Sequence, residues 1–126
     1  MIELSTAIVV VAPPLAPIEQ PIDVTHLARM TLGDASLERE VLQLYDRQAE
    51  MLLARMQQAA PAAAAAHAHT LKGSSSGIGA WKVARAAEAV ELAAISNSAD
   101  MASVITALNA AVGEARAVIA ELLRAH

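Results

Sequence analysis

The sequence predicts an all-α protein, an antiparallel up-and-down four-helix bundle with a short extra helix and an extended arm at its N-terminus. Of the 126 residues, 56% are apolar, but only 2% are aromatic and none is Phe. Alanine is the commonest residue, and it is the best helix former and a poor strand former. Four long stretches also have apolar residues at helical spacing. The short turns between them favour antiparallel neighbours.

Charge and composition exclude several classes of protein. The net charge is −4 and the nine basic residues are scattered, so we expect no nucleic-acid partner. The absence of cysteine excludes disulfides, thiol catalysis and a thiolate zinc site. His67 and His69 are two residues apart and cannot share a metal on one helix face, so no metal site is expected. The length fits one domain.

The first residues predict an arm rather than a targeting segment. The apolar run 7–12 is far shorter than a membrane span, no basic residue precedes it, and prolines follow at once. We therefore expect a cytoplasmic protein without membrane contact. Residues 1–21 form the predicted arm and residues 22–126 the bundle. The β-branched run Ile8–Val11 leaves two interpretations, a flexible leader, which we favour, and a strand-like arm packed on the bundle or on a second copy.

Capping and helix-breaking residues set the expected helix boundaries. Asp and Ser suit N-caps, Pro suits a first turn, and Gly suits the residue after a helix. Gly77 and Gly79 mark the end of the third helix, and residues 96–98 form the turn before the last. The expected helices are, approximately, Asp23 to Thr31, Asp34 or Ser36 to Ala59, Pro61 to Ser76, Ala80 to Ile95 and Ala99 to Arg124.

Helical spacing also predicts which side chains face the core. The positions expected to point inward are Leu37, Val41, Leu44, Tyr45, Met51, Leu52 and Met56 in the second helix, Ala64, Ala68, Leu71, Ser75 and Ile78 in the third, Val83, Ala87, Val90 and Ala94 in the fourth, and Met101, Ile105, Leu108, Val112, Ile119 and Leu122 in the last.

The third helix carries the residues with a chemical meaning. His69 lies about 200° around the axis from Leu71, so it faces away from the core, with Lys72 and Gly73 beside it at i+3 and i+4. An exposed imidazole is neutral for much of the time near pH 7 and is then a nucleophile. The Lys72 ammonium would offset charge on incoming phosphoryl oxygens. Gly73 removes a side chain where a partner must approach, at a cost of about 1 kcal/mol in helix propensity.

The segment from Ala68 to Ala80 resembles the signature of histidine-containing phosphotransfer domains. The signature reads roughly Ala-His-x-Leu-Lys-Gly-Ser-Ser, three variable residues, then Gly-Ala. The matching residues are Ala68, His69, Leu71, Lys72, Gly73, Ser74, Ser75, Gly79 and Ala80. The resemblance covers about residues 34–124 and is strong over 68–91. Tyr45 stands where the family often has Phe, the helices are richer in Ala than usual, and the arm has no counterpart.

The resemblance implies a function for these residues. It implies a four-helix bundle on which His69 accepts a phosphoryl group and exchanges it with an aspartate of a response-regulator receiver domain. A hybrid sensor histidine kinase would be the other partner. The family's polar residue that hydrogen-bonds the second ring nitrogen corresponds to Glu91, with Glu88 as the fallback. Lys72, Gly73 and Ser76 would lie on the docking face with Ala62, Ala65 and Ala66.

The same resemblance implies a carrier rather than an enzyme. We expect a monomer without autokinase activity and without a cofactor, the magnesium ion being held by the partner receiver domain.

Other interpretations are weaker. A phosphate-binding P-loop contains Gly-Lys-Ser/Thr, whereas in Lys72-Gly73-Ser74 the lysine precedes the glycine, so nucleotide binding is not expected. A sensor-kinase dimerisation segment would usually have an acidic residue after the histidine, whereas Thr70 follows here. The alternative function is a non-catalytic adaptor or dimerisation bundle that keeps the fold without the phosphotransfer.

Overall fold

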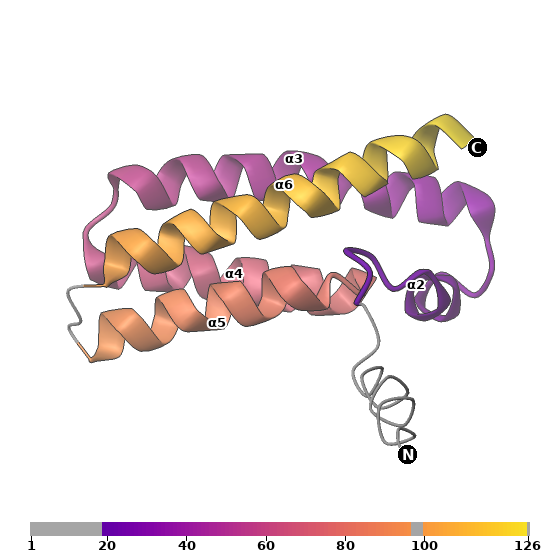
Figure 1. The fold of residues 1–126 in the computed structure, drawn as a ribbon. Helices are drawn as coiled ribbons and strands as arrows, with labels where there is room; N and C mark the ends of the chain where they lie inside the picture. Colours follow the sequence, from indigo (N-terminus) through magenta and orange to yellow (C-terminus); the bar gives the residue numbers. More distant parts are fainter. Residues whose placement is uncertain (1–18, 97–99, 126) are drawn as a thin grey trace, which may run out of the picture.

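The computed structural model describes residues 19–96 and 100–125. Every regular element in this part of the chain is a helix, which confirms the all-α prediction. Within the described residues a short helix is followed by four long helices, and Figure 1 shows how they are arranged. Their bounds are α2 Val24–Met30, α3 Ala35–Gln58, α4 Pro61–Ile78, α5 Trp81–Ile95 and α6 Met101–Ala125.

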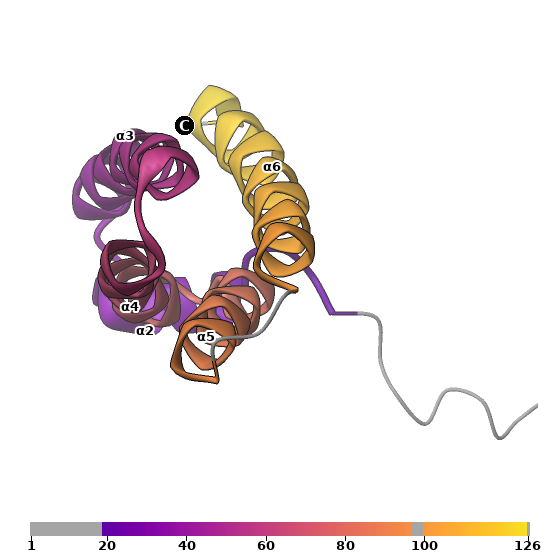
Figure 2. The same cartoon turned by 90° about the vertical axis from the view of Figure 1, so that its left-hand side faces the viewer.

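The four long helices surround one core. Consecutive helices pack on each other, α3 on α4, α4 on α5 and α5 on α6, and α6 also contacts α3. Figure 2 shows the four helices end on, arranged around a common centre. The short helix α2 packs against α4 at one end.

The start of the described chain is fastened to the bundle. Asp23 caps α2 by accepting a hydrogen bond from the backbone N–H of His26 at 3.1 Å, as predicted. Glu19 pairs with Arg85 of α5, and Ile22 is buried in the core. Within the described residues, Glu19 and Ile22 thus already contact the bundle, although both positions fall at the edge of the predicted arm. The predicted arm residues 1–18 lie outside the described part of the chain.

The turn between α4 and α5 fits closely against the segment before α2. Gly79 ends α4 with a φ of +85°, and its carbonyl accepts a hydrogen bond from the Asp23 backbone N–H at 2.9 Å. The Trp81 indole N–H donates to the Asp23 carboxylate at 3.0 Å, so the start of α5 is fastened to the segment before α2. Helix α4 continues to Ile78, and Gly77 lies within it, so the prediction that Gly77 marks its end is wrong.

The core confirms the predicted inward faces of α4, α5 and α6 in large part. All five expected positions of α4 are buried, as are Val83, Ala87 and Val90 of α5 and Leu108, Val112 and Ile119 of α6. Ala94, Met101, Ile105 and Leu122 are half-buried. The predicted turn residues Asn97 and Ser98, and the predicted helix start at Ala99, lie outside the described residues.

Helix α3 corrects the prediction. Leu37, Leu44 and Met51 were expected to point inward but are 40, 60 and 42% exposed. Tyr45 is buried, whereas Leu44, about 100° further around the helix, lies off the face that the other helices cover. The rest of the inward face includes three residues that the prediction missed: Leu42, Ala49 and Leu53.

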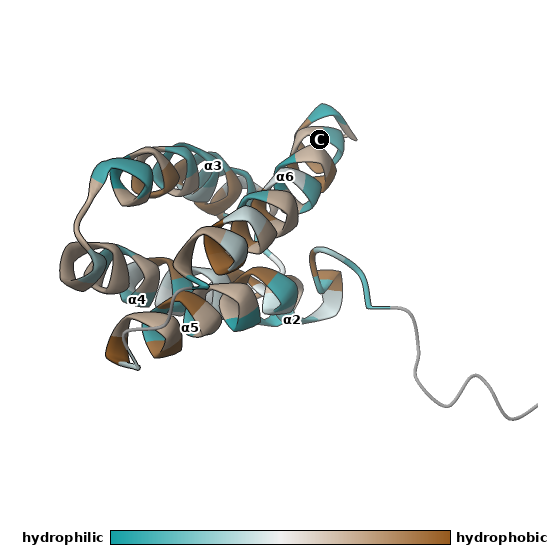
Figure 3. Cartoon of the chain, turned by 60° about the vertical axis from the view of Figure 1, so that its left-hand side comes forward, coloured by the Kyte–Doolittle hydropathy of each residue, from teal (hydrophilic) through white to brown (hydrophobic). Residues whose placement is uncertain are grey.

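Polar residues mark the outer surfaces of the helices. In Figure 3 α3 carries much hydrophilic colour, as do α6 near the C-terminus and the segment before α2, whereas α4 is mostly of intermediate hydropathy, in keeping with its alanines. Among the described residues, α6 is long and apolar enough to cross a membrane by length and composition. The residues of α6 that are buried in the core of the bundle are Leu108, Val112, Ala115 and Ile119.

Candidate functional site

Helix α4 presents His69 to solvent because its apolar stripe faces inward. Pro61 occupies the first turn of the helix, where its missing N–H costs nothing. Ala68 and Leu71 on either side of His69 are fully buried, which fixes the rotation of the helix. The His69 side chain is left 71% exposed.

A carboxylate from the neighbouring helix joins two of the predicted site residues. Glu91 of α5 lies with one oxygen, Oε2, 2.8 Å from His69 Nδ1. Its other oxygen, Oε1, lies 2.8 Å from Lys72 Nζ. Glu91 is only 18% exposed, so the ring and the ammonium meet over a carboxylate that is largely shielded from water. Because Glu91 occupies Nδ1, Nε2 is the ring nitrogen available to an incoming group.

The charges in this cluster reinforce one another. Burial raises the pKa of Glu91, but its ion pair with Lys72 and its hydrogen bond with His69 outweigh burial and leave the pKa below its ordinary value. The ion pair with Glu91 raises the pKa of Lys72. Both groups are therefore charged at neutral pH. Glu88, the fallback partner, is exposed and acts on Lys72 only through its charge.

The other predicted site residues line the outside of α4. Gly73 is exposed, and a Cβ added there would meet no atom of the described chain within 4 Å. Ala62 and Ala66 are exposed, whereas Ala65 and Ser76 are half-buried. The surface next to His69 therefore carries only small side chains at these positions, which leaves space for another molecule to approach.

Sequence reasoning missed the opposite flank of α4, where it meets α3. Ser74 donates a hydrogen bond to Gln48 Oε1 at 2.8 Å. The Tyr45 and Ser75 hydroxyls lie 2.7 Å apart in the core, and burial raises the pKa of Tyr45 to about 12. A pocket of about 190 Å³ opens there, lined by Val41, Leu44, Tyr45, Gln48, Ser74 and Ile78. Leu44 was the signal in the sequence that could have pointed to this pocket, but its helical spacing was interpreted as that of a core residue.

The remaining histidines stand apart from this cluster. His26 packs edge-on against Trp81, with ring centroids 4.8 Å apart. His67 is half-buried, and His126 lies outside the described residues. Within residues 19–96 and 100–125, no three His, Asp or Glu side chains are grouped so that they could hold a metal ion.

The arrangement defines a class of site: an exposed imidazole, oriented through one nitrogen by a carboxylate, with an ammonium group close by. A family model described as Hpt domain matches residues 40–124, and the chain belongs to that family. Its members serve in histidine phosphotransfer in phosphorelays and interact with response regulators. Searches of curated proteins and of solved structures found no match.

Proposed function

We propose that this chain is a histidine phosphotransfer protein that accepts a phosphoryl group on His69 and exchanges it with the aspartate of response-regulator receiver domains. The observation that carries the proposal is the Glu91 carboxylate, 2.8 Å from both His69 Nδ1 and Lys72 Nζ. A surface histidine without a function would not need a largely shielded carboxylate to hold one of its nitrogens.

The geometry suits nucleophilic attack by Nε2. A carboxylate at Nδ1 favours the tautomer with its proton on Nδ1, which leaves a lone pair on Nε2. That lone pair forms the N–P bond while the P–O bond of the partner's aspartyl phosphate breaks, and the aspartate leaves as a carboxylate. The imidazole gains positive charge, which Glu91 offsets, and Lys72 is close enough to offset charge on the phosphoryl oxygens. The reverse transfer uses the same groups.

The proposal includes the partners and the setting. A hybrid sensor histidine kinase and receiver domains are the proposed partners, docking over Ala62, Ala65, Ala66, Lys72, Gly73 and Ser76. The chain is proposed to act as a cytoplasmic monomer and as a carrier rather than an enzyme, without nucleic-acid or membrane contact. It needs no cofactor of its own, since the receiver domain would hold the Mg²⁺ ion.

We also propose that α3 to α6 form an antiparallel up-and-down bundle. Two contacts between α3 and α6 support it: Arg39 donates to the Leu123 carbonyl, and Arg116 pairs with Asp46. From Arg39 to Asp46 the residue numbers rise along α3, whereas their partners on α6 fall from Leu123 to Arg116, so the two helices run in opposite directions. In such a bundle α4 and α5 run in opposite directions, and His69, midway along α4, meets Glu91 in the second half of α5.

Phosphotransfer from receiver domains tests the function. The protein would be incubated with a panel of phosphorylated receiver domains from the same organism, beside a His69→Gln control. We expect an acid-labile, base-stable phosphate on the wild type alone, detected by intact mass. No label from any receiver in the full panel would favour the adaptor function instead.

A further inference from the structure

We propose that residues 13–18 pack along the outer face of α5 in the same molecule. In this arrangement Leu15 covers Leu92 and Ile95. The segment 13–18 directly precedes the described part of the chain, which begins at Glu19. The inference does not depend on phosphotransfer, because it rests on contacts and composition outside the histidine site.

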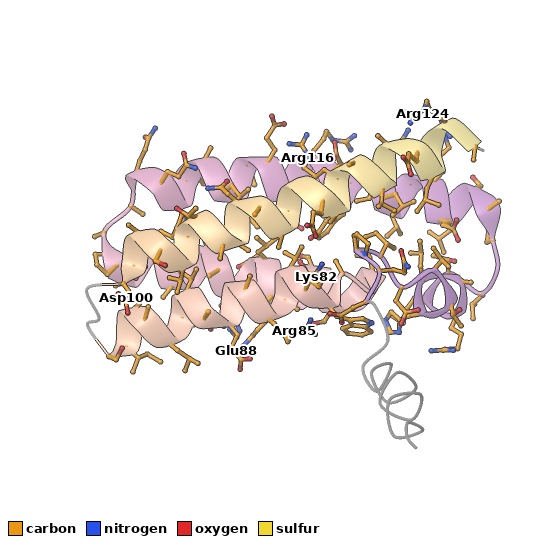
Figure 4. The ribbon with its side chains drawn as sticks, viewed as in Figure 1. Lys82, Arg85, Glu88, Asp100, Arg116 and Arg124 are labelled. Carbon is orange, nitrogen blue, oxygen red and sulfur yellow. The ribbon has the colours of Figure 1, made fainter. Side chains whose placement is uncertain are left out.

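One stripe of α5 lies opposite the buried residues of this helix. Its members recur at intervals of three and four residues and are Trp81, Arg85, Glu88, Leu92 and Ile95. Figure 4 shows Arg85 and Glu88 projecting from α5 on the side away from α6. Leu92 and Ile95 follow on the same stripe and are 59 and 80% exposed. The second half of the stripe is therefore apolar, and nothing in the described part of the chain covers it.

Two contacts give the direction in which the chain runs along this stripe. The Asp23 carboxylate accepts a hydrogen bond from the Trp81 indole N–H at the start of α5. Glu19, four residues earlier in the chain, pairs with Arg85, one turn further along α5. From Asp23 to Glu19 the residue numbers fall, whereas those of their partners on α5 rise. Continued in the same direction, the residues before Glu19 would pass toward Leu92.

The lengths match for an extended segment. Three of its six residues are proline, which favours an extended chain with a rise of about 3.1 Å per residue. Leu15 precedes Glu19 by four residues, so it reaches about 12 Å beyond Glu19. Leu92 and Ile95 follow Arg85 by seven and ten residues, which is about 10.5 and about 15 Å along the helix axis. Leu15 can therefore lie between Leu92 and Ile95.

The composition of the segment suits burial against an apolar stripe. None of its six side chains is polar, and Glu3 is the only charged side chain before Glu19. Segments that stay unpacked in water are usually rich in charge and poor in large apolar residues, unlike this one. Its three prolines have no N–H, so fewer backbone donors need a partner when the segment lies against a helix. Contact of Leu15 with the stripe removes apolar surface from water on both sides.

A spin label tests where the segment lies in the full-length protein. The chain has no cysteine, so Ala16→Cys provides a single attachment point for a nitroxide. Nuclear magnetic resonance then measures how strongly the label broadens each backbone amide signal. We expect stronger broadening at Leu92 and Ile95 than at Met30 and Leu32, which are also exposed and apolar but lie in and after α2. The reverse order would overturn the inference.

A second labelled variant separates packing from the length of the tether. Leu15→Ser keeps the length and the prolines of the segment but removes the apolar side chain. We expect it to reduce the broadening at Leu92 and Ile95 about threefold or more, because burial of the leucine supplies most of the packing free energy. Equal broadening with and without Leu15→Ser would overturn the inference, since the tether alone would then explain it.

A mixing experiment distinguishes one molecule from two. Spin-labelled protein without isotope is mixed with isotope-labelled protein that carries no spin label. We expect the signals of Leu92 and Ile95 to stay unchanged in the mixture. Broadening there would assign the segment to a second copy of the chain and overturn its placement within one molecule.

Discussion

Glu91 is the residue on which the chemistry of the site depends most. Its two oxygens serve different groups, one accepting from the His69 ring and the other pairing with the Lys72 ammonium. Hydrogen bonds to an ionised acceptor are about twice as strong as neutral ones. A single side chain from α5 thus fixes the imidazole tautomer and holds the ammonium close to the ring.

Two substitutions of Glu91 separate orientation from charge. Glu91→Gln retains an oxygen that can accept from Nδ1–H, whereas Glu91→Ala removes the contact. We expect Glu91→Ala to slow phosphorylation of His69 about tenfold or more, the scale of effect seen when a side chain that orients a reacting histidine or ligand is lost. Glu91→Gln should retain more of the rate. Rates from single-turnover transfer check this, and equal rates for both variants and wild type would contradict the orienting role.

The lowered pKa of Glu91 predicts a pH dependence of stability. The pKa is lower in the folded protein than its ordinary value of 4.5, so the stabilising contribution is present above about pH 4.5. It is lost as the pH falls through the lowered folded-state value. Urea unfolding of wild type and Glu91→Gln at about pH 6 and about pH 3 checks this. The difference in unfolding free energy should shrink at the lower pH, and a constant difference would count against it.

Between the helices, the α3–α4 contact depends on a buried hydroxyl pair. Tyr45 stands where the phosphotransfer family often has Phe, and its hydroxyl lies 2.7 Å from the hydroxyl of Ser75. Both residues are almost completely buried, so either hydroxyl left without its partner pays a desolvation cost. This pair fixes the position of α3 against the segment of α4 that follows His69.

Tyr45→Phe should therefore cost about 1–2 kcal/mol of unfolding free energy, although the ring is retained. Ser75→Ala should cost a similar amount, and the double variant should cost less than the sum, because the two residues are in contact. Denaturant unfolding of the four proteins measures this coupling. Additive losses would show that the two hydroxyls do not interact.

The α4–α5 turn depends on a glycine. A Cβ on Gly79 would lie 2.9 Å from the Asp23 backbone oxygen, and the φ of +85° is unfavourable for any other residue. We expect Gly79→Ala to lower the unfolding free energy by about 1–3 kcal/mol. Gly73→Ala is the matched control: it lies in open space within α4 and should stabilise by up to about 1 kcal/mol. A neutral Gly79→Ala would contradict the close contact.

Helical spacing predicts the buried face of α4 well and the buried face of α3 poorly. In α4 the side chains off the core are small or polar, so one stripe stood out, and all five predicted positions are buried. In α3 large apolar residues stand on two adjacent faces, and spacing alone could not show which face the other helices would cover. The exposed face includes Leu44, which lines a pocket together with residues of α4. The sequence of α3 alone does not show that α4 packs beside this face.

For the molecule as a whole, the sequence predicted the all-α class and the exposure of His69, because both follow from composition and periodicity within single helices. The contact between His69 and Glu91 joins residues 22 positions apart, and periodicity cannot supply it. The resemblance to the phosphotransfer family pointed to Glu91, and the structure places the two side chains together. The pocket was not predicted, because it requires the relative placement of two helices.

The position of the phosphoryl group on the imidazole tests this arrangement most directly. After transfer from a receiver domain, nuclear magnetic resonance of the labelled His69 ring distinguishes attachment at the two nitrogens. We predict phosphorylation at Nε2, with Nδ1 still bound to Glu91. Phosphorylation at Nδ1, or on a residue other than His69, would contradict the proposed site.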